Sequence, residues 1–64
     1  MDEYTARARQ VYGGWEVTVA GVPGATFIHR HPTEEVTHER LAAVLDRTDF
    51  GVSLVRDYVG QPPR

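Results

Sequence analysis

The first third of the chain alternates between hydrophobic and polar residues, which is the pattern of β-strands that bury one face. In residues 15–20 the side chains expected to face the core are Trp15, Val17 and Val19. In residues 4–12 they are Tyr4, Ala6 and Ala8, with Thr5, Arg7 and Arg9 on the other side. Between the two stretches, Gly13 and Gly14 predict a tight turn, because glycine adopts positive φ without steric penalty. The two stretches therefore predict an antiparallel hairpin.

Two further strands are expected, one before and one after a helix. The sequence Val22-Pro23-Gly24 suits a β-turn with proline at its second position and glycine at its third. It leads into a strand over residues 25–30, in which we place Phe27 and His29 on the face opposite to Ile28 and away from the core. The last strand is expected over residues 52–59, with Val52, Leu54 and Tyr58 inward and Ser53, Val55 and Asp57 outward. Residues 60–64 should form a frayed tail.

The segment from residue 32 or 33 to residue 47 has the spacing of an amphipathic helix. Pro32 suits the first helical position, and Glu34 and Glu35 suit the positive end of the helix dipole. Arg47 suits the negative end. The residues expected to face the core are Val36, Leu41, Val44 and Leu45, with Thr37 and Thr48 at the margins. Those expected to face outward are Glu35, His38, Glu39, Ala42 and Asp46.

The order βββαβ predicts an α+β fold of two layers. A right-handed crossover from the third strand places the fourth beside the first, in a four-stranded mixed sheet of order 3-2-1-4 with one helix on one face. The opposite face of the sheet is left uncovered, which is typical of a docking surface when hydrophobic side chains lie on it. The candidate partner-binding residues on that face are Arg7, Arg9, Phe27, His29 and Val55.

The length and composition of the chain indicate a single small domain that gains stability from association. The 64 residues are expected to form one domain with a core at about residues 4–59. A chain of this size buries only about 60% of its unfolded surface. It contains no cysteine, which excludes disulfides and thiolate zinc sites. A homodimer or a higher homo-oligomer is therefore the expected source of extra stability.

Charge and hydropathy narrow the classes of partner. The formal net charge is −2, and the chain lacks the basic stripe that nucleic-acid-binding modules carry. No hydrophobic run approaches the roughly 18 residues of a membrane span. The sequence Met-Asp-Glu-Tyr at the N-terminus has no signal-peptide character. We therefore expect a cytoplasmic protein that contacts no membrane and does not bind nucleic acid by itself.

Two groups of polar residues raise the question of a reaction or a metal. His29, His31 and His38, with Glu35 or Glu39, could be read as metal ligands. An His-x-His pair is weak evidence, however, and we favour solvated polar residues and no metal. The glutamates at the start of the helix are typical of dipole and solubility residues. No serine nucleophile has a base at a recognisable spacing. The sequence therefore predicts neither an enzyme nor a cofactor.

Arg7 and Arg9 leave the same side of the first strand, so they could contact phosphates or the acidic groups of a protein partner. Pairing with Glu16 on the neighbouring strand is the commoner use of such residues. Trp15 could be an exposed anchor for a partner, but its phase with Val17 and Val19 favours a core position. A small RNA-binding module that uses the open sheet face remains the alternative.

The pattern of strands and turns resembles the HicB-like antitoxin family, in particular its short members. The resemblance lies in Tyr-Thr-Ala-Arg-Ala from residue 4, in Gly-Trp-Glu-Val-Thr-Val-Ala-Gly-Val-Pro-Gly over residues 14–24, and in Pro-Thr-Glu-Glu-Val from residue 32. It extends over about residues 4–59 and rests mostly on strand and turn chemistry. It implies a fold resembling a partial double-stranded-RNA-binding domain, and a domain that neutralises a small HicA-type mRNA-cleaving toxin by covering its active surface.

The chain departs from the family pattern at its C-terminal end. Many members carry a C-terminal DNA-binding segment after the last strand, whereas this sequence ends at Arg64. The catalytic histidine that the toxin carries in a Gly-Ser-His context is absent, so the chain resembles the antitoxin. A solitary domain of this type, with no toxin partner, is a further alternative.

Overall fold

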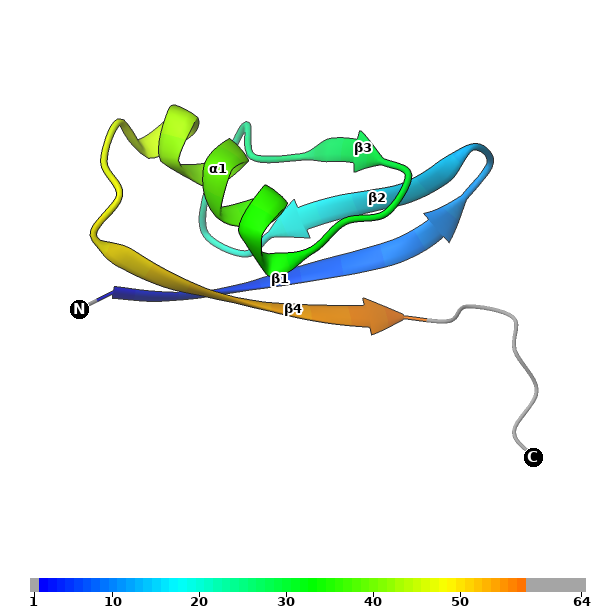
Figure 1. The fold of residues 1–64 in the computed structure, drawn as a ribbon, viewed down its shortest axis with the longest axis horizontal. Coiled ribbons are helices and arrows are strands. Elements are labelled where there is room, and N and C mark those ends of the chain that lie inside the picture. Colours follow the sequence, from blue (N-terminus) through cyan, green and yellow to red (C-terminus); the bar gives the residue numbers. More distant parts are fainter. Residues whose placement is uncertain (1, 58–64) are drawn as a thin grey trace.

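A computed structural model of the chain describes residues 2–57. The elements follow in the order β1 (Asp2–Val11), β2 (Gly14–Val19), β3 (Phe27–His29), α1 (Glu34–Leu45) and β4 (Phe50–Asp57) (Figure 1). The predicted order βββαβ is therefore confirmed. The strand expected from residue 52 begins at Phe50, and the third strand is shorter than predicted. The predictions for Tyr58 and for the tail over residues 60–64 lie outside the described residues.

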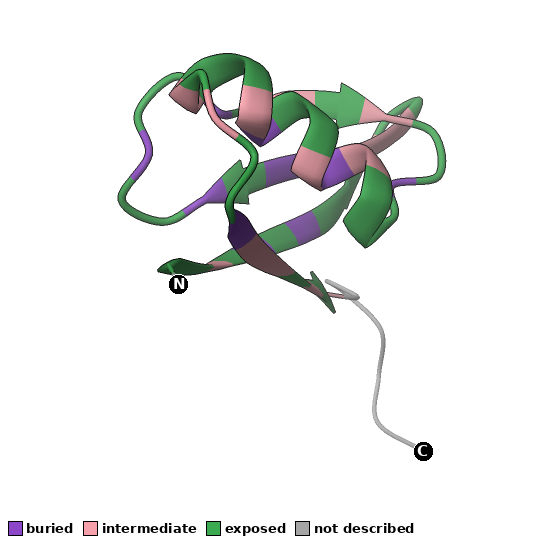
Figure 2. Ribbon diagram, turned by 60° about the vertical axis from the view of Figure 1, so that its left-hand side comes forward, coloured by how far each residue is buried: buried purple, intermediate pink, exposed green. Residues whose placement is uncertain are grey.

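The strands form one sheet in the order β3-β2-β1-β4, as predicted. β1 pairs antiparallel with β2 and parallel with β4, while β3 pairs antiparallel with β2. The helix α1 lies across one face of this sheet (Figure 2). Within residues 2–57 no element covers the other face, and we call the two sides the helix face and the open face.

Two turns connect the first three strands. Val11 pairs with Gly14, so the loop of the hairpin consists of Tyr12 and Gly13 rather than the predicted pair of glycines. After β2, the amide of Ala25 donates to the carbonyl of Val22 at 3.3 Å, and Gly24 has a φ of +86°. This is the predicted turn with proline second and glycine third. The two residues that flank it, Val22 and Ala25, are both buried.

The helix begins one or two residues later, and ends two residues earlier, than the sequence suggests. Thr33 is the N-cap, and its hydroxyl oxygen accepts from the amide of Val36 at 3.1 Å. Pro32 precedes this cap and is not the first helical residue. A threonine hydroxyl satisfies one of the amides that have no partner in the first turn, which explains why the cap forms there. Asp46 ends the helix in the left-handed region, at φ 59°.

The core lies between α1 and the helix face of the sheet. Leu41 is 1% exposed and Thr37 is fully buried. The prediction that Val44 faces the core is wrong, since it is 44% exposed. Thr37 takes a central place because its hydroxyl donates to the carbonyl of Thr33 at 2.8 Å, so the buried oxygen is paired. The buried hydrophobic residues are Ala6, Ala8, Val17, Val19, Val22, Ala25, Leu41 and Phe50.

The ends of the core are closed by half-buried residues. Trp15 packs against the buried cluster, as predicted, and the guanidinium of Arg56 lies 5.6 Å from the centre of its ring. At the other end, His38 stacks on Phe50 with ring centroids 4.3 Å apart. The prediction that His38 faces solvent is therefore wrong, because its ring covers that of a buried phenylalanine.

Candidate functional site

The open face is the candidate interaction surface of this domain. Side chains alternate between the two faces of a strand, and directly paired residues share a face. The strand registers therefore place Arg7 and Val55 side by side on the open face, with Arg9 beside Asp57 in the next row. The predictions for Arg7, Arg9 and Val55 agree with this arrangement. The open face consists of Glu3, Thr5, Arg7, Arg9, Glu16, Thr18, Ile28, Ser53, Val55 and Asp57.

Two of the predicted surface residues lie on the helix face. Phe27 pairs with Val17 and His29 pairs with Trp15, so both share the face that α1 covers. Phe27 packs against the core, with the guanidinium of Arg40 5.1 Å from the centre of its ring. The phase that we expected for the third strand is wrong. A strand of three residues has too few alternations to define its inner side.

Ile28 occupies the position on the open face that the sequence assigned to Phe27. It pairs with Glu16 and is 60% exposed. Sequence reasoning missed it because isoleucine is usually buried. Ala25 is buried and lies two residues before Phe27, so it indicates that Phe27 faces the core and Ile28 faces away from it. Tyr12, at the tip of the hairpin, is fully exposed and was also not singled out.

Four charged side chains of the open face form ion pairs with one another. Arg9 Nε donates to Glu16 Oε1 at 2.9 Å, across β1 and β2, as the sequence favoured. Arg7 Nη1 donates to both carboxylate oxygens of Asp57, at 3.0 and 3.1 Å, across β1 and β4. Exposed ion pairs of this kind contribute only about 0–1 kcal/mol to stability. They fix the positions of two arginines on β1 between a glutamate on β2 and an aspartate on β4.

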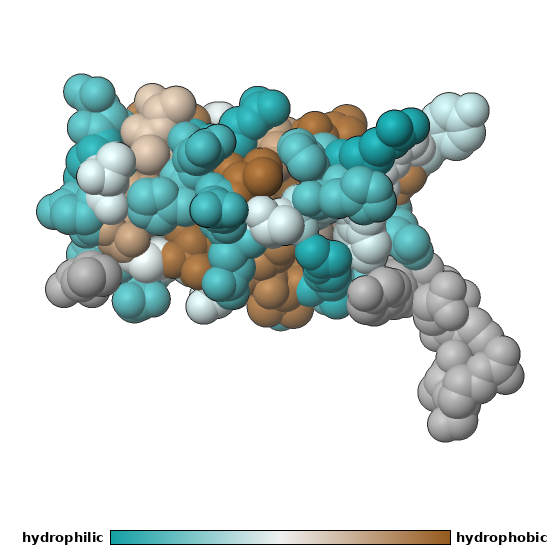
Figure 3. All heavy atoms as spheres, viewed as in Figure 1, coloured by the Kyte–Doolittle hydropathy of each residue, from teal (hydrophilic) through white to brown (hydrophobic). Residues whose placement is uncertain are grey.

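The hydrophobic side chains of the open face do not form a continuous patch. Ile28 lies on β3 and Val55 on β4, which are the two edges of the sheet. Since neighbouring strands lie about 4.8 Å apart, about 14 Å separates these two strands. On the side that carries α1, which Figure 3 shows, hydrophobic residues also form separate patches between hydrophilic ones. A hollow of about 330 Å³ opens on the sheet, lined by Thr5, Arg7, Thr18, Val19 and Ala20.

Two features limit the pairing of the strand edges with another chain. β3 has only three residues, and short edge strands resist pairing with other chains. On the other edge, the amide of Leu54 donates to Glu34 Oε2 at 3.4 Å, so the start of α1 occupies one outward amide of β4. Both features limit strand addition at the edges, whereas no element of residues 2–57 covers the open face.

The three histidines are not gathered at one place. The amide of His31 donates to Nδ1 of His29 at 3.0 Å. His38 lies on α1, and its Nε2 donates to the carbonyl of Thr48 at 3.2 Å, since a carbonyl oxygen only accepts. No group of three or more His, Asp or Glu side chains within residues 2–57 is placed to hold a metal ion.

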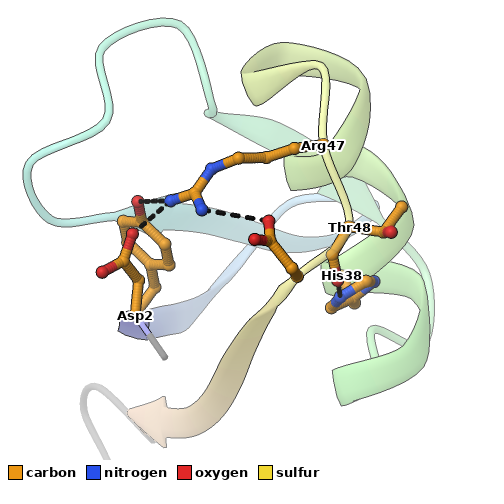
Figure 4. Close-up of polar contacts among 6 residues, drawn as sticks. Asp2, His38, Arg47 and Thr48 are labelled. Atoms are coloured by element: carbon orange, nitrogen blue, oxygen red, sulfur yellow. Dashed lines mark hydrogen bonds and ion pairs between the residues drawn. The ribbon is translucent and has the colours of Figure 1, made fainter.

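A polar cluster joins the start of β1 to the loop after α1 (Figure 4). Arg47 binds the carboxylate of Asp2 and donates to the hydroxyl of Tyr4 at 3.2 Å and to Asp49 at 3.0 Å. These hydrogen bonds, above all that to Asp2, raise the pKa of Arg47 above its usual value. Arg47 does not lie in the last helical turn as predicted; it closes the end of the sheet near Phe50. We assign this cluster a structural role.

Among residues 2–57, no helix is long and apolar enough to cross a membrane. Comparisons with protein-family models, with curated proteins and with solved structures find no match to this chain.

Proposed function

We propose that this chain is a non-enzymatic protein–protein interaction domain of the cytoplasm that acts as a HicB-type antitoxin. The observation that carries the proposal is the open face, a four-stranded surface that no element of residues 2–57 covers. Covering the active surface of a second protein requires a broad and rigid surface of this kind. The resemblance of residues 4–59 to short HicB-like antitoxins supplies the class of partner, a small HicA-type toxin.

The charge pattern of the open face favours a protein partner over RNA. Arg7 and Arg9 are both engaged by carboxylates of the same sheet, at 3.0 and 2.9 Å. Phosphate binding would require these pairs to open, and the strands described here bring no further basic side chain to the face. RNA binding by the open face is the alternative function, and it predicts a mobility shift that falls steeply with salt.

Co-expression with the small open reading frames that adjoin the gene tests the proposal. We expect a toxin-sized protein to co-purify with the chain, and growth to recover when the chain is expressed with that toxin. The variant Arg7→Glu alters the open face and should weaken both effects. Glu39→Arg, on the exposed side of α1, is the matched control and should change neither.

Failure of every adjacent small protein to co-purify would contradict the toxin part of the proposal. A salt-dependent mobility shift with RNA, lost in Arg7→Glu and retained in Glu39→Arg, would favour the alternative. If self-association persists without either partner, the chain is a solitary interaction domain.

A further inference from the structure

The charges of the open face are arranged so that they complement a second copy of the same face. In the order β3-β2-β1-β4, the midline of the sheet runs between β2 and β1. Arg9 lies on one side of that line and Glu16 lies directly opposite on the other side. A two-fold axis parallel to the strands along this midline therefore exchanges the two positions. It places Arg9 over Glu16 of the second copy and Glu16 over Arg9.

We propose that two copies of this chain pack open face to open face about such an axis, with Arg9 and Glu16 of both copies forming a closed ring of four alternating charges. The proposal rests on the proposed function, namely that the open face binds proteins; a second copy on that face excludes a toxin from it, so the two partners compete. The same axis places β3 over β4 of the second copy. Ile28 then faces Asp57 of the second copy, because both lie in the row of Arg9, and Val55 lies one row further along that strand.

The alternative symmetric packing is electrostatically unfavourable when its axis is centred on the two arginines. A two-fold axis across the strands would place β1 over β1 of the second copy. Both arginines of the face, Arg7 and Arg9, are on β1, so this packing stacks like charges when the axis crosses β1 at Ala8. Like charges that face each other across an interface disfavour that packing. An axis at Ala6 would instead place Arg9 over Glu3, and that packing would not be weakened by Glu16→Arg. The strand-parallel axis instead sets the arginine-bearing strand over β2, which carries Glu16 and Thr18.

The size of the face indicates a weak dimer. Four strands at about 4.8 Å spacing and about six residues of 3.4 Å cover roughly 400 Å² per copy in projection. The total is below the roughly 1,200–2,000 Å² that stable complexes bury. We therefore expect a dissociation constant on the order of 10–100 µM, and concentrations must exceed that range to populate the dimer.

Charge exchange between two variants tests the geometry. Arg9→Glu makes all four charges of the ring negative, and Glu16→Arg makes all four positive. Each variant alone should therefore weaken the dimer by about ten-fold or more, as measured by sedimentation. An equimolar mixture should restore it. In the mixed dimer the substituted carboxylate of one variant faces the substituted guanidinium of the other, and the two unaltered side chains also face each other with opposite charges. Mixing cannot repair the ion pair within either chain, so rescue reports a contact between chains.

Two further variants keep the test independent of folding. The double variant Arg9→Glu with Glu16→Arg retains opposite charges both within the chain and across the interface, and it should dimerise as the unaltered chain does. Glu39→Arg makes the same charge change as Glu16→Arg, but on the exposed side of α1, and should also dimerise normally. Circular dichroism melts verify that each variant is folded.

Three results would overturn the proposal. The unaltered chain could remain monomeric well above 100 µM, which is on the order of the expected constant. Both single variants could dimerise normally, which would place self-association on another surface. The mixture of the two could fail to recover. In each case co-purification with a toxin-sized protein is measured separately, so the proposed antitoxin function can survive the loss of this geometry.

Discussion

The carbonyl oxygen of His29 lies so close to Gly14 that a Cβ on residue 14 would stand 2.7 Å from it. Gly14 also has a φ of +154°, which side chains rarely adopt. Glycine is therefore required here to let β3 approach the start of β2.

We predict that Gly14→Ala lowers stability by at least about 2 kcal/mol, because a backbone atom would have to move. Gly51→Ala is the matched control. The atoms nearest to a Cβ there belong to the flexible end of Glu3, at 2.7 Å, and can move away. Thermal melts of both variants measure the difference. Equal melting temperatures would show that β3 is not held against β2 as described.

Leu41 lies at the centre of the contact between α1 and the sheet, at 1% exposure. Leu41→Ala should cost about 2–5 kcal/mol, which is much of the stability of a domain this small. Val44→Ala, on the same helix at 44% exposure, should change stability by less than about 1 kcal/mol. Chemical denaturation followed by circular dichroism compares the two. A larger loss for Val44 would mean that the buried side of the helix is wrongly assigned.

The cluster around Arg47 should hold the first residues of β1 in the sheet. Arg47→Gln removes the charge that binds Asp2 and leaves Tyr4 with a weaker partner. We expect faster amide hydrogen exchange over residues 2–4 and 50–52, with little change in β2. Arg7→Gln removes an ion pair in the middle of β1 and serves as the control. Unchanged exchange at the start of β1 would contradict the role given to Arg47.

The sequence predicts the fold well wherever a pattern repeats. In β1, β2 and β4, three or more alternating positions define which side is inner, and Ala6, Ala8, Val17 and Val19 are buried as expected. The glycine and proline signals around residues 13 and 23 give the two turns for local steric reasons, although the first turn is shifted by one residue.

The predictions fail where a residue's place depends on distant parts of the chain. β3 offers only Phe27, Ile28 and His29, so its phase is set by pairing with β2 and not by its own pattern. His38 faces Phe50 because the chain returns to the sheet after the helix. Arg47 contacts Asp2, which lies 45 residues earlier in the chain, and no local sequence pattern indicates that contact. The sequence thus predicts that one face of the sheet is open and that Val55 lies on it, but it assigns Phe27 to that face in place of Ile28.

The corrected open face gives the last prediction, which concerns its two exposed hydrophobic residues. Ile28→Glu and Val55→Glu should each leave the fold intact, because these side chains are 60% and 39% exposed. Each should weaken self-association measured by sedimentation, since a carboxylate would be buried against a second copy without a partner of opposite charge.

Two comparisons make this prediction specific to the open face. Val44→Glu introduces the same charge at a similarly exposed valine, 44%, on the helix side, and should leave self-association unchanged. Phe27→Glu should instead destabilise the monomer by at least about 2 kcal/mol, because Phe27 packs against the core beneath Arg40. If Val44→Glu disrupts the oligomer and Val55→Glu does not, the interface lies over the helix, since both substitutions place a glutamate at a similarly exposed valine.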